Sequence, residues 1–303
     1  MMRIGELILN QSKKGLENKR YAILCAAILA IVPFASWLSV ALVVLVTLRK
    51  GGKSGFEVLF PALIIHSVPL MMLVPVESAL INTLIAYLPC YFAALVLRKN
   101  ANWQAVAGVF FLQALIAFVL VQLLLPNFAV IQFTHFKAML SHYEEYKQFI
   151  ENSMQGINSL NLAQLFFGAQ ILSVFASALI SLFFARFIQA QLFVPGGLKV
   201  ELSDFRGGKL AFLVLAAISI ASYYESAFAI NLLPLVLSYF LLSGFNLSYF
   251  VLARKWHLKV VILLFLLIMF KPTLMLFAFI IFGLLDSLFN FRLYLPRRAR
   301  ESI

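Results

Sequence analysis

Residues 21–48 read YAILCAAILAIVPFASWLSVALVVLVTL, and no charged side chain interrupts them. About 20 helical residues cross the hydrocarbon layer of a membrane, so this stretch is long enough to span it. Comparable apolar stretches follow along the chain at 56–76, 79–97, 105–125, 162–185, 210–224, 227–253 and 258–289. The sequence therefore predicts an all-α fold, a polytopic bundle of transmembrane helices.

The composition supports this fold class. Hydrophobic residues make up 63% of the chain and charged residues 12%, whereas soluble domains carry about 25% charged residues. A soluble fold of this length could not bury so much apolar surface. The lipid bilayer is therefore the first predicted partner. The net charge of +12 does not indicate nucleic-acid binding, because the Lys and Arg residues form short clusters between the apolar stretches and no continuous basic face.

Two of the apolar stretches, 21–48 and 258–289, are too long for a single crossing. At about 1.5 Å per residue each exceeds about 40 Å, against a hydrocarbon thickness of ~30 Å. Each contains a proline, Pro33 or Pro272, which interrupts a helix. Basic residues flank both stretches at both ends, and such residues favour the cytoplasmic side. We therefore expect two hairpins or re-entrant segments, eight to ten membrane segments in all, and both termini in the cytoplasm.

The distribution of charge and of turn residues divides the chain into four parts. We expect a cytoplasmic N-terminal segment at 1–20, a six-segment membrane core at 21–188, a cytoplasmic loop at 189–209, and C-terminal membrane segments with a basic tail at 210–303. Within the core, apolar residues recur at helical spacing over 135–157 with charged residues between them. This pattern predicts an external amphipathic helix.

Three of the expected outer connections, at 32–37, 75–83 and 127–161, together offer aromatic residues and several polar groups, the combination that a small-ligand site needs. The candidate ligand-binding residues are Ser36, Trp37, Glu77, Asn82, Tyr143 and Glu144. The alternative interpretation is that the aromatic residues anchor the chain at the membrane interface and the polar ones are solvated.

Small residues recur at every fourth position in two of the predicted helices. They are Ala22, Ala26, Ala30, Ala169, Ser173, Ser177, Ser181 and Ala185. Rows of this kind let two helices approach closely in lipid. They serve either packing inside the bundle or docking of another membrane protein subunit.

Two further groups of polar residues lie in apolar surroundings. His66 lies between two prolines, and its ring either has a function inside the membrane or bonds a carbonyl freed by Pro69. Asp286 and Asn290 are one helical turn apart and share a face. Asp286 could pair with Arg292 or with a basic inner loop.

Signatures of catalysis and of metal binding are absent from the sequence. It contains no HExxH motif, no GxSxG motif, no phosphate-binding glycine loop and no Cys/His cluster with metal-ligand spacing. Cys25 and Cys90 both lie within apolar stretches, where cysteine behaves as a small hydrophobic residue. We therefore expect a protein that is not an enzyme and has no cofactor or metal.

Residues 47–55, TLRKGGKSG, and 283–292, GLLDSLFNFR, resemble the YybS-like family of bacterial multi-pass membrane proteins. The polar and glycine positions that go with this resemblance are Arg49, Gly52, Gly55, His66, Asp286, Asn290 and Arg292. The family is distantly similar to the S components of energy-coupling-factor transporters and to the rod-shape protein MreD. The resemblance implies location in a bacterial cytoplasmic (inner) membrane.

In S components the outer loops cover a vitamin-sized ligand, and a face with Ala-xxx-Ala spacing docks the coupling subunit. Ala26 and Ala30 match that spacing here, whereas residues 210–303 have no counterpart in S components. The resemblance implies a transport subunit that binds a small solute. The alternative is a non-enzymatic membrane scaffold, or a partner protein, in cell-envelope processes.

Overall fold

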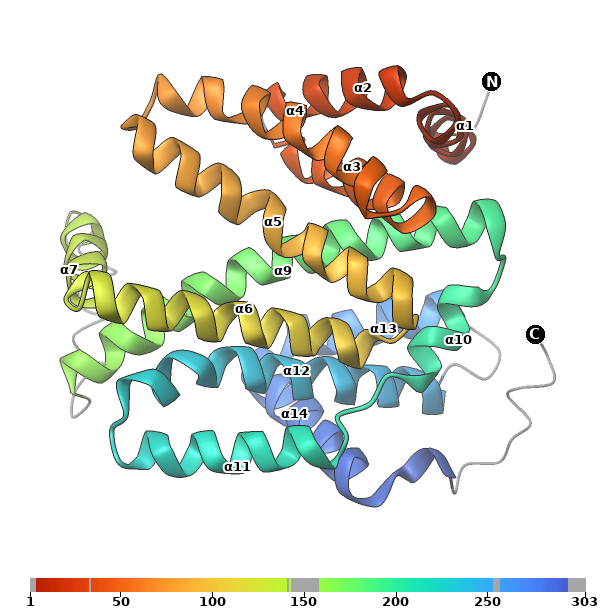
Figure 1. The fold of residues 1–303 in the computed structure, drawn as a ribbon. Coiled ribbons are helices and arrows are strands. Elements are labelled where there is room, and N and C mark those ends of the chain that lie inside the picture. Colours follow the sequence, from red (N-terminus) through yellow and green to blue (C-terminus); the bar gives the residue numbers. More distant parts are fainter. Residues whose placement is uncertain (1–3, 33, 141, 143–157, 253–256, 294–303) are drawn as a thin grey trace. The chain divides into compact units, whose positions relative to one another are not determined.

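The computed structural model describes residues 4–32, 34–140, 142, 158–252 and 257–293. Throughout these residues the regular structure is helical and contains no strand, which confirms the all-α prediction (Figure 1). The chain forms two compact units. Unit 1 consists of Met1–Phe110 and Ser173–Phe205, and unit 2 of Phe111–Leu172 and Arg206–Ile303.

Unit 1 is built on four helices, α2 to α5, that pack against one another. Its helices are α1 (Ile4–Glu17), α2 (Lys19–Ile31), α3 (Ser36–Lys50), α4 (Gly52–Met71), α5 (Val76–Asn100), the start of α6 (Trp103–Leu124), the end of α9 (Ser159–Phe193) and α10 (Gly197–Asp204). The core between these helices contains Val44, Leu59 and Tyr87, whose exposed fractions do not exceed 1%.

The apolar stretch 21–48 is divided into α2 and α3, as its central proline predicts. The side chain of Asn18 caps α2 by accepting from the backbone N–H groups of Arg20 and Tyr21. The Ser39 hydroxyl of α3 donates to the carbonyl of Ala26 in α2 over 2.7 Å. The two helices are therefore held together as a pair.

The turn between α3 and α4 depends on the glycines of the 47–55 stretch. Gly51 has φ 107°, a backbone conformation that L side chains rarely adopt, and the Arg98 guanidinium lies where its Cβ would be. Gly55 lies against Thr47, with no room for a side chain. The Tyr91 hydroxyl of α5 donates to the carbonyl of Gly52 over 3.0 Å. These glycines thus make a tight turn that α5 covers.

Unit 2 contains the second apolar stretch that the sequence predicts to be interrupted. Its elements are the rest of α6, α7 (Phe128–Leu140), the start of α9, α11 (Lys209–Tyr223), α12 (Ala227–Leu252), α13 (His257–Phe270), α14 (Pro272–Phe289) and the short 3₁₀ helix η1 (Phe291–Leu293). The break between α13 and α14 falls at Lys271 and Pro272. Gly244 of α12 and Gly283 of α14 bring the two backbones into contact.

Six of the described helices are long and apolar enough to cross a membrane, namely α4, α5, α6, α9, α12 and α14. The pair α10 and α11, taken as one broken span, would make a seventh. Only 22% to 44% of the residues in these apolar segments are buried inside the protein, so most of their surface is left to face lipid. The fold is that of a multi-pass membrane protein, and the predicted total of eight to ten segments stays a prediction.

Two of the predicted parts differ in detail from the structure. Residues 189–209 were expected to form a loop, but they contain the end of α9 and the whole of α10, because the glycines at 196, 197, 207 and 208 bound a short helix-forming segment. The helix expected at 135–157 is described only as far as α7, which begins earlier, at Phe128, and ends at Leu140. Residues 141 and 143–157 lie outside the described residues.

The two compact units do not follow the predicted division into 21–188 and 210–303. The boundary after Phe205 falls within the predicted loop at 189–209, and unit 2 also takes Phe111–Leu172 from the predicted core. The reason is the length of α6 and α9, each of which contributes one end to each unit.

Candidate functional site

His66 is an ionisable side chain within α4, a membrane-length helix of unit 1. It lies in α4 between Pro61 and Pro69 and is half-buried. Its Nδ1 atom is 3.0 Å from the Thr83 hydroxyl of α5. Its ring meets the ring of Tyr87 edge-on, with 5.3 Å between centroids. The described hydrogen bond therefore goes to a hydroxyl and not to a carbonyl freed by Pro69.

Two further hydroxyl groups, those of Tyr87 and Ser39, form a second side-chain hydrogen bond beside His66. The Tyr87 hydroxyl donates to Ser39 Oγ over 3.0 Å, and Ser39 in turn donates to the carbonyl of Ala26. Thr83, Tyr87 and Ser39 are each at most 2% exposed. We refer to His66, Thr83, Tyr87 and Ser39 as the His66 cluster, which joins helices α2, α3, α4 and α5.

The cluster leaves one ring nitrogen of His66 available. Among the described residues no hydrogen bond to Nε2 is found, whereas Nδ1 is held by Thr83. A neutral imidazole has one donor and one acceptor nitrogen, so Nε2 can donate or accept according to the tautomer. The cluster can thus orient His66 toward a polar solute or a proton.

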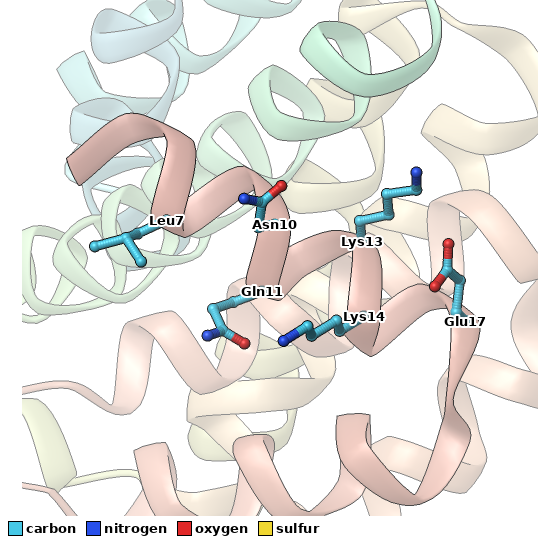
Figure 2. A pocket seen from close by; sticks show the side chains of 6 residues that line it. All are labelled: Leu7, Asn10, Gln11, Lys13, Lys14 and Glu17. Atoms are coloured by element: carbon cyan, nitrogen blue, oxygen red, sulfur yellow. The ribbon is translucent and has the colours of Figure 1, made fainter. Parts of the chain in front are cut away.

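Two neighbouring cavities lie at the basic end of unit 1, beside α1. The first, of about 400 Å³, is lined by Leu7, Asn10, Gln11, Lys13, Lys14 and Glu17 (Figure 2). The second, of about 380 Å³, is lined by Lys13, Leu16, Glu17, Arg49, Lys50 and Phe193. The Arg49 guanidinium lies over the Phe193 ring, 4.0 Å from its centroid. Arg49, singled out in the sequence, therefore belongs to a cavity wall.

The predicted outer residues that the structure describes are not part of the two cavities beside α1, and the outer site stays a prediction. Neither cavity is lined by Ser36, Trp37, Glu77 or Asn82. The Trp37 ring packs edge-on against Phe184, with 5.5 Å between centroids. Glu77 and Asn82 are exposed near the start of α5. Tyr143 and Glu144 lie outside the described residues.

The two rows of small residues have different environments. Ala22, Ala26 and Ala30 are buried within unit 1, with exposed fractions of 1%, 0% and 4%. This row packs inside the protein, where it lets α2 approach its neighbours. The row on α9 is buried at Ser181 and Ala185, whereas its remaining members, Ala169, Ser173 and Ser177, are exposed.

Asp286 forms an ion pair at the end of α14. Its Oδ2 atom is 3.2 Å from Arg292 Nε, and its side chain is fully buried. The observed partner is therefore Arg292, one of the two predicted alternatives. Its Oδ1 atom has no hydrogen-bond partner among the described residues. Asn290 ends the helix with φ 47° and donates its N–H to the carbonyl of Asp286.

A charged contact that was not expected from the sequence joins α9 to α10. Arg186 forms a two-point ion pair with Glu201, and the Trp103 indole also donates to Glu201, over 3.2 Å. The carboxylate and the guanidinium are 11% and 15% exposed. No local pattern relates the three residues. The sequence does not single out Glu201, because a second acid, Asp204, lies three residues away in the same basic segment.

These observations define the class of the chain, a multi-pass helical membrane protein. In the part of the chain that the structure describes, no three side chains of the metal-binding types come together. Comparison with protein-family models, curated proteins and solved structures finds no match. The resemblance to the YybS-like family therefore stays a prediction.

Proposed function

We propose that this protein is a transport subunit of a bacterial cytoplasmic membrane and that His66 contacts the small polar solute or the proton that it handles. The observation that supports the proposal is the His66 cluster, in which an ionisable ring is oriented by hydroxyl groups within apolar helices. Polar groups at such depth cost free energy, so they are usually found where a substrate or proton passes.

The proposal moves the solute contact away from the outer connections. Trp37, the aromatic residue expected there, already packs against Phe184. His66 instead has an available Nε2 atom and lies between two prolines, whose missing backbone donors loosen the hydrogen bonding of α4. Thr83 and Tyr87 would act as positioning residues that hold the ring.

A ligand screen combined with a flux measurement tests the proposal. The unfolding temperature of the purified protein is measured in the presence of soluble vitamins, nucleobases and amino acids. Proton movement is measured in proteoliposomes that contain a pH-sensitive dye. We expect either that one of the compounds raises the unfolding temperature or that the proteoliposomes show a proton flux. Whichever effect the wild type shows, we expect His66→Phe to lose it. The matched control is Ile64→Phe, because Ile64 is on the same helix and 50% exposed.

Equal binding and equal flux in wild type and His66→Phe would contradict the proposal. Tyr87→Phe provides a second comparison, since it removes one hydroxyl and keeps the ring that packs on His66. A weaker effect of the ligand in this variant is expected for a positioning residue.

A second function, that of a membrane scaffold, is favoured by the exposed part of the row on α9. Ala169, Ser173 and Ser177 are exposed small residues on a membrane-length helix, which suits close approach of a helix from another protein. Ser177→Leu is expected to lose a partner in affinity purification while the amount of protein in the membrane is unchanged. Phe183→Leu, also exposed on α9, is the control.

A further inference from the structure

One side of helix α1 packs against the rest of unit 1, and its other side is exposed. Leu16 and Ser12 are buried, and Gly15 faces the side chain of Leu42 in α3. Leu7 and Ile8 are 44% and 40% exposed. In Figure 1 α1 is seen nearly along its axis whereas α2 runs across the page, so α1 lies at a steep angle to α2. An amphipathic helix set across the end of a membrane bundle suits the headgroup layer.

The two cavities beside α1 are strongly basic. Together they are lined by four cations, Lys13, Lys14, Arg49 and Lys50, and by one carboxylate, Glu17. None of these cations is in an ion pair with any residue that the structure describes. The excess positive charge is therefore available to an anion from outside the chain.

The walls of the cavities are partly apolar. Leu7 lines the first cavity, and Leu16 and Phe193 line the second. Phe193 is 38% exposed, with the Arg49 guanidinium over its ring. A guanidinium held against an aromatic face keeps its N–H donors directed at its edge, where a phosphate can accept them. The cavities thus combine cations with apolar surface, the two properties of a lipid at the headgroup boundary.

We propose that these cavities bind the phosphate of an anionic phospholipid. The site lies at the ends of α3 and α9, beside the start of the membrane-length helix α4. Basic pockets between helices at the cytoplasmic side recognise anionic headgroups through this combination of charges. The lipid phosphate lies among Lys13, Arg49 and Lys50, and the glycerol and first acyl carbons lie along Phe193 and Leu16. The proposal is independent of the His66 cluster.

Native mass spectrometry of the full chain in detergent tests the site with short-chain lipids. The probes are dioctanoyl phosphatidylglycerol, dioctanoyl phosphatidylcholine and, as a free phosphate, glycerol 3-phosphate. The test variant is Lys13→Gln/Lys50→Gln, whose two side chains are exposed cavity residues. The matched control is Lys53→Gln/Lys99→Gln, which removes two exposed charges that line neither cavity.

We expect wild type to bind phosphatidylglycerol at least tenfold more tightly than either other probe. The cavity variant should lose about tenfold or more in affinity, and the control should stay within about twofold. Equal losses in both variants would overturn the site, because they would show non-specific attraction by net charge. Equal binding of glycerol 3-phosphate would overturn the assignment to a lipid. Elution from gel filtration at the wild-type volume shows that each variant is folded.

Discussion

Among single residues, Glu201 joins three separate elements. It accepts from Arg186 of α9 and from Trp103 at the start of α6, and it belongs to α10. Because both charged side chains are largely buried, their pairing is screened little by water. Removal of one partner would leave the other charge buried without its neighbour.

Glu201→Ala is therefore expected to destabilise the protein by roughly 3 kcal/mol, the range found when one member of a buried pair is deleted. The measurement is unfolding in mild detergent, followed by far-ultraviolet circular dichroism. The double change Arg186→Met/Glu201→Leu should recover much of the loss, because it removes both charges and keeps apolar volume. Asp204→Asn, an exposed acid on the same helix, is the control. A wild-type midpoint for Glu201→Ala would contradict the assigned role.

At the scale of elements, the turn between α3 and α4 shows how local sequence directs tertiary packing. Gly51 ends α3 and precedes α4, and its backbone has φ 107° and ψ 173°. This region is open essentially to glycine alone. The Arg98 side chain then occupies the space that a Cβ would fill and donates to the carbonyl of Thr47 over 3.4 Å. The turn and α5 thus depend on each other.

Gly51→Ala is expected to cost about 1–3 kcal/mol of stability, because alanine is strained in that conformation and displaces Arg98. A lowered unfolding midpoint in detergent measures the effect. Gly108→Ala serves as the matched control, since a Cβ there meets no atom within 4 Å and alanine favours a helix. If both variants unfold at the same temperature as wild type, the turn does not require glycine.

The elements that the sequence predicts well are those determined by neighbouring residues. The interruptions of 21–48 and 258–289 are found where the sequence places a proline, because proline acts on its own helix. The His66 cluster could not be predicted as a unit, because Ser39, Thr83 and Tyr87 lie on separate helices and each is an ordinary residue in its own stretch. The packing of Trp37 on Phe184 likewise depends on α3 meeting α9.

Across the molecule as a whole, basic residues that are far apart in the sequence gather at one end of unit 1. Lys13 and Lys50, from either side of the first apolar stretch, line the same cavity. Lys19 pairs with Glu57 at 2.7 Å, which joins the start of α2 to the start of α4. The return of the chain to one end is what the hairpin interpretation of residues 21–48 requires.

Reporter fusions measure which side of the membrane this end faces. Alkaline phosphatase fused after Lys50 or after Ile303 is expected to be inactive, because clustered Lys and Arg keep their segment in the cytoplasm. A fusion after Val74, between α4 and α5, is expected to be active and provides the control. Activity after Lys50 would show that residues 21–48 cross the membrane once.

The length of α9 has a consequence for how the protein fits lipid layers of different thickness. Its 35 residues measure about 52 Å, well beyond the ~30 Å of hydrocarbon. Transmembrane helices rarely tilt by more than about 40°, so tilting alone cannot keep the whole of α9 within the hydrocarbon layer. The water boundary then falls near Arg186, the first charge along the helix. The final two turns, which end at Phe193, then reach into the headgroup layer, so a thinner or thicker bilayer would change how deep that ring lies among the headgroups.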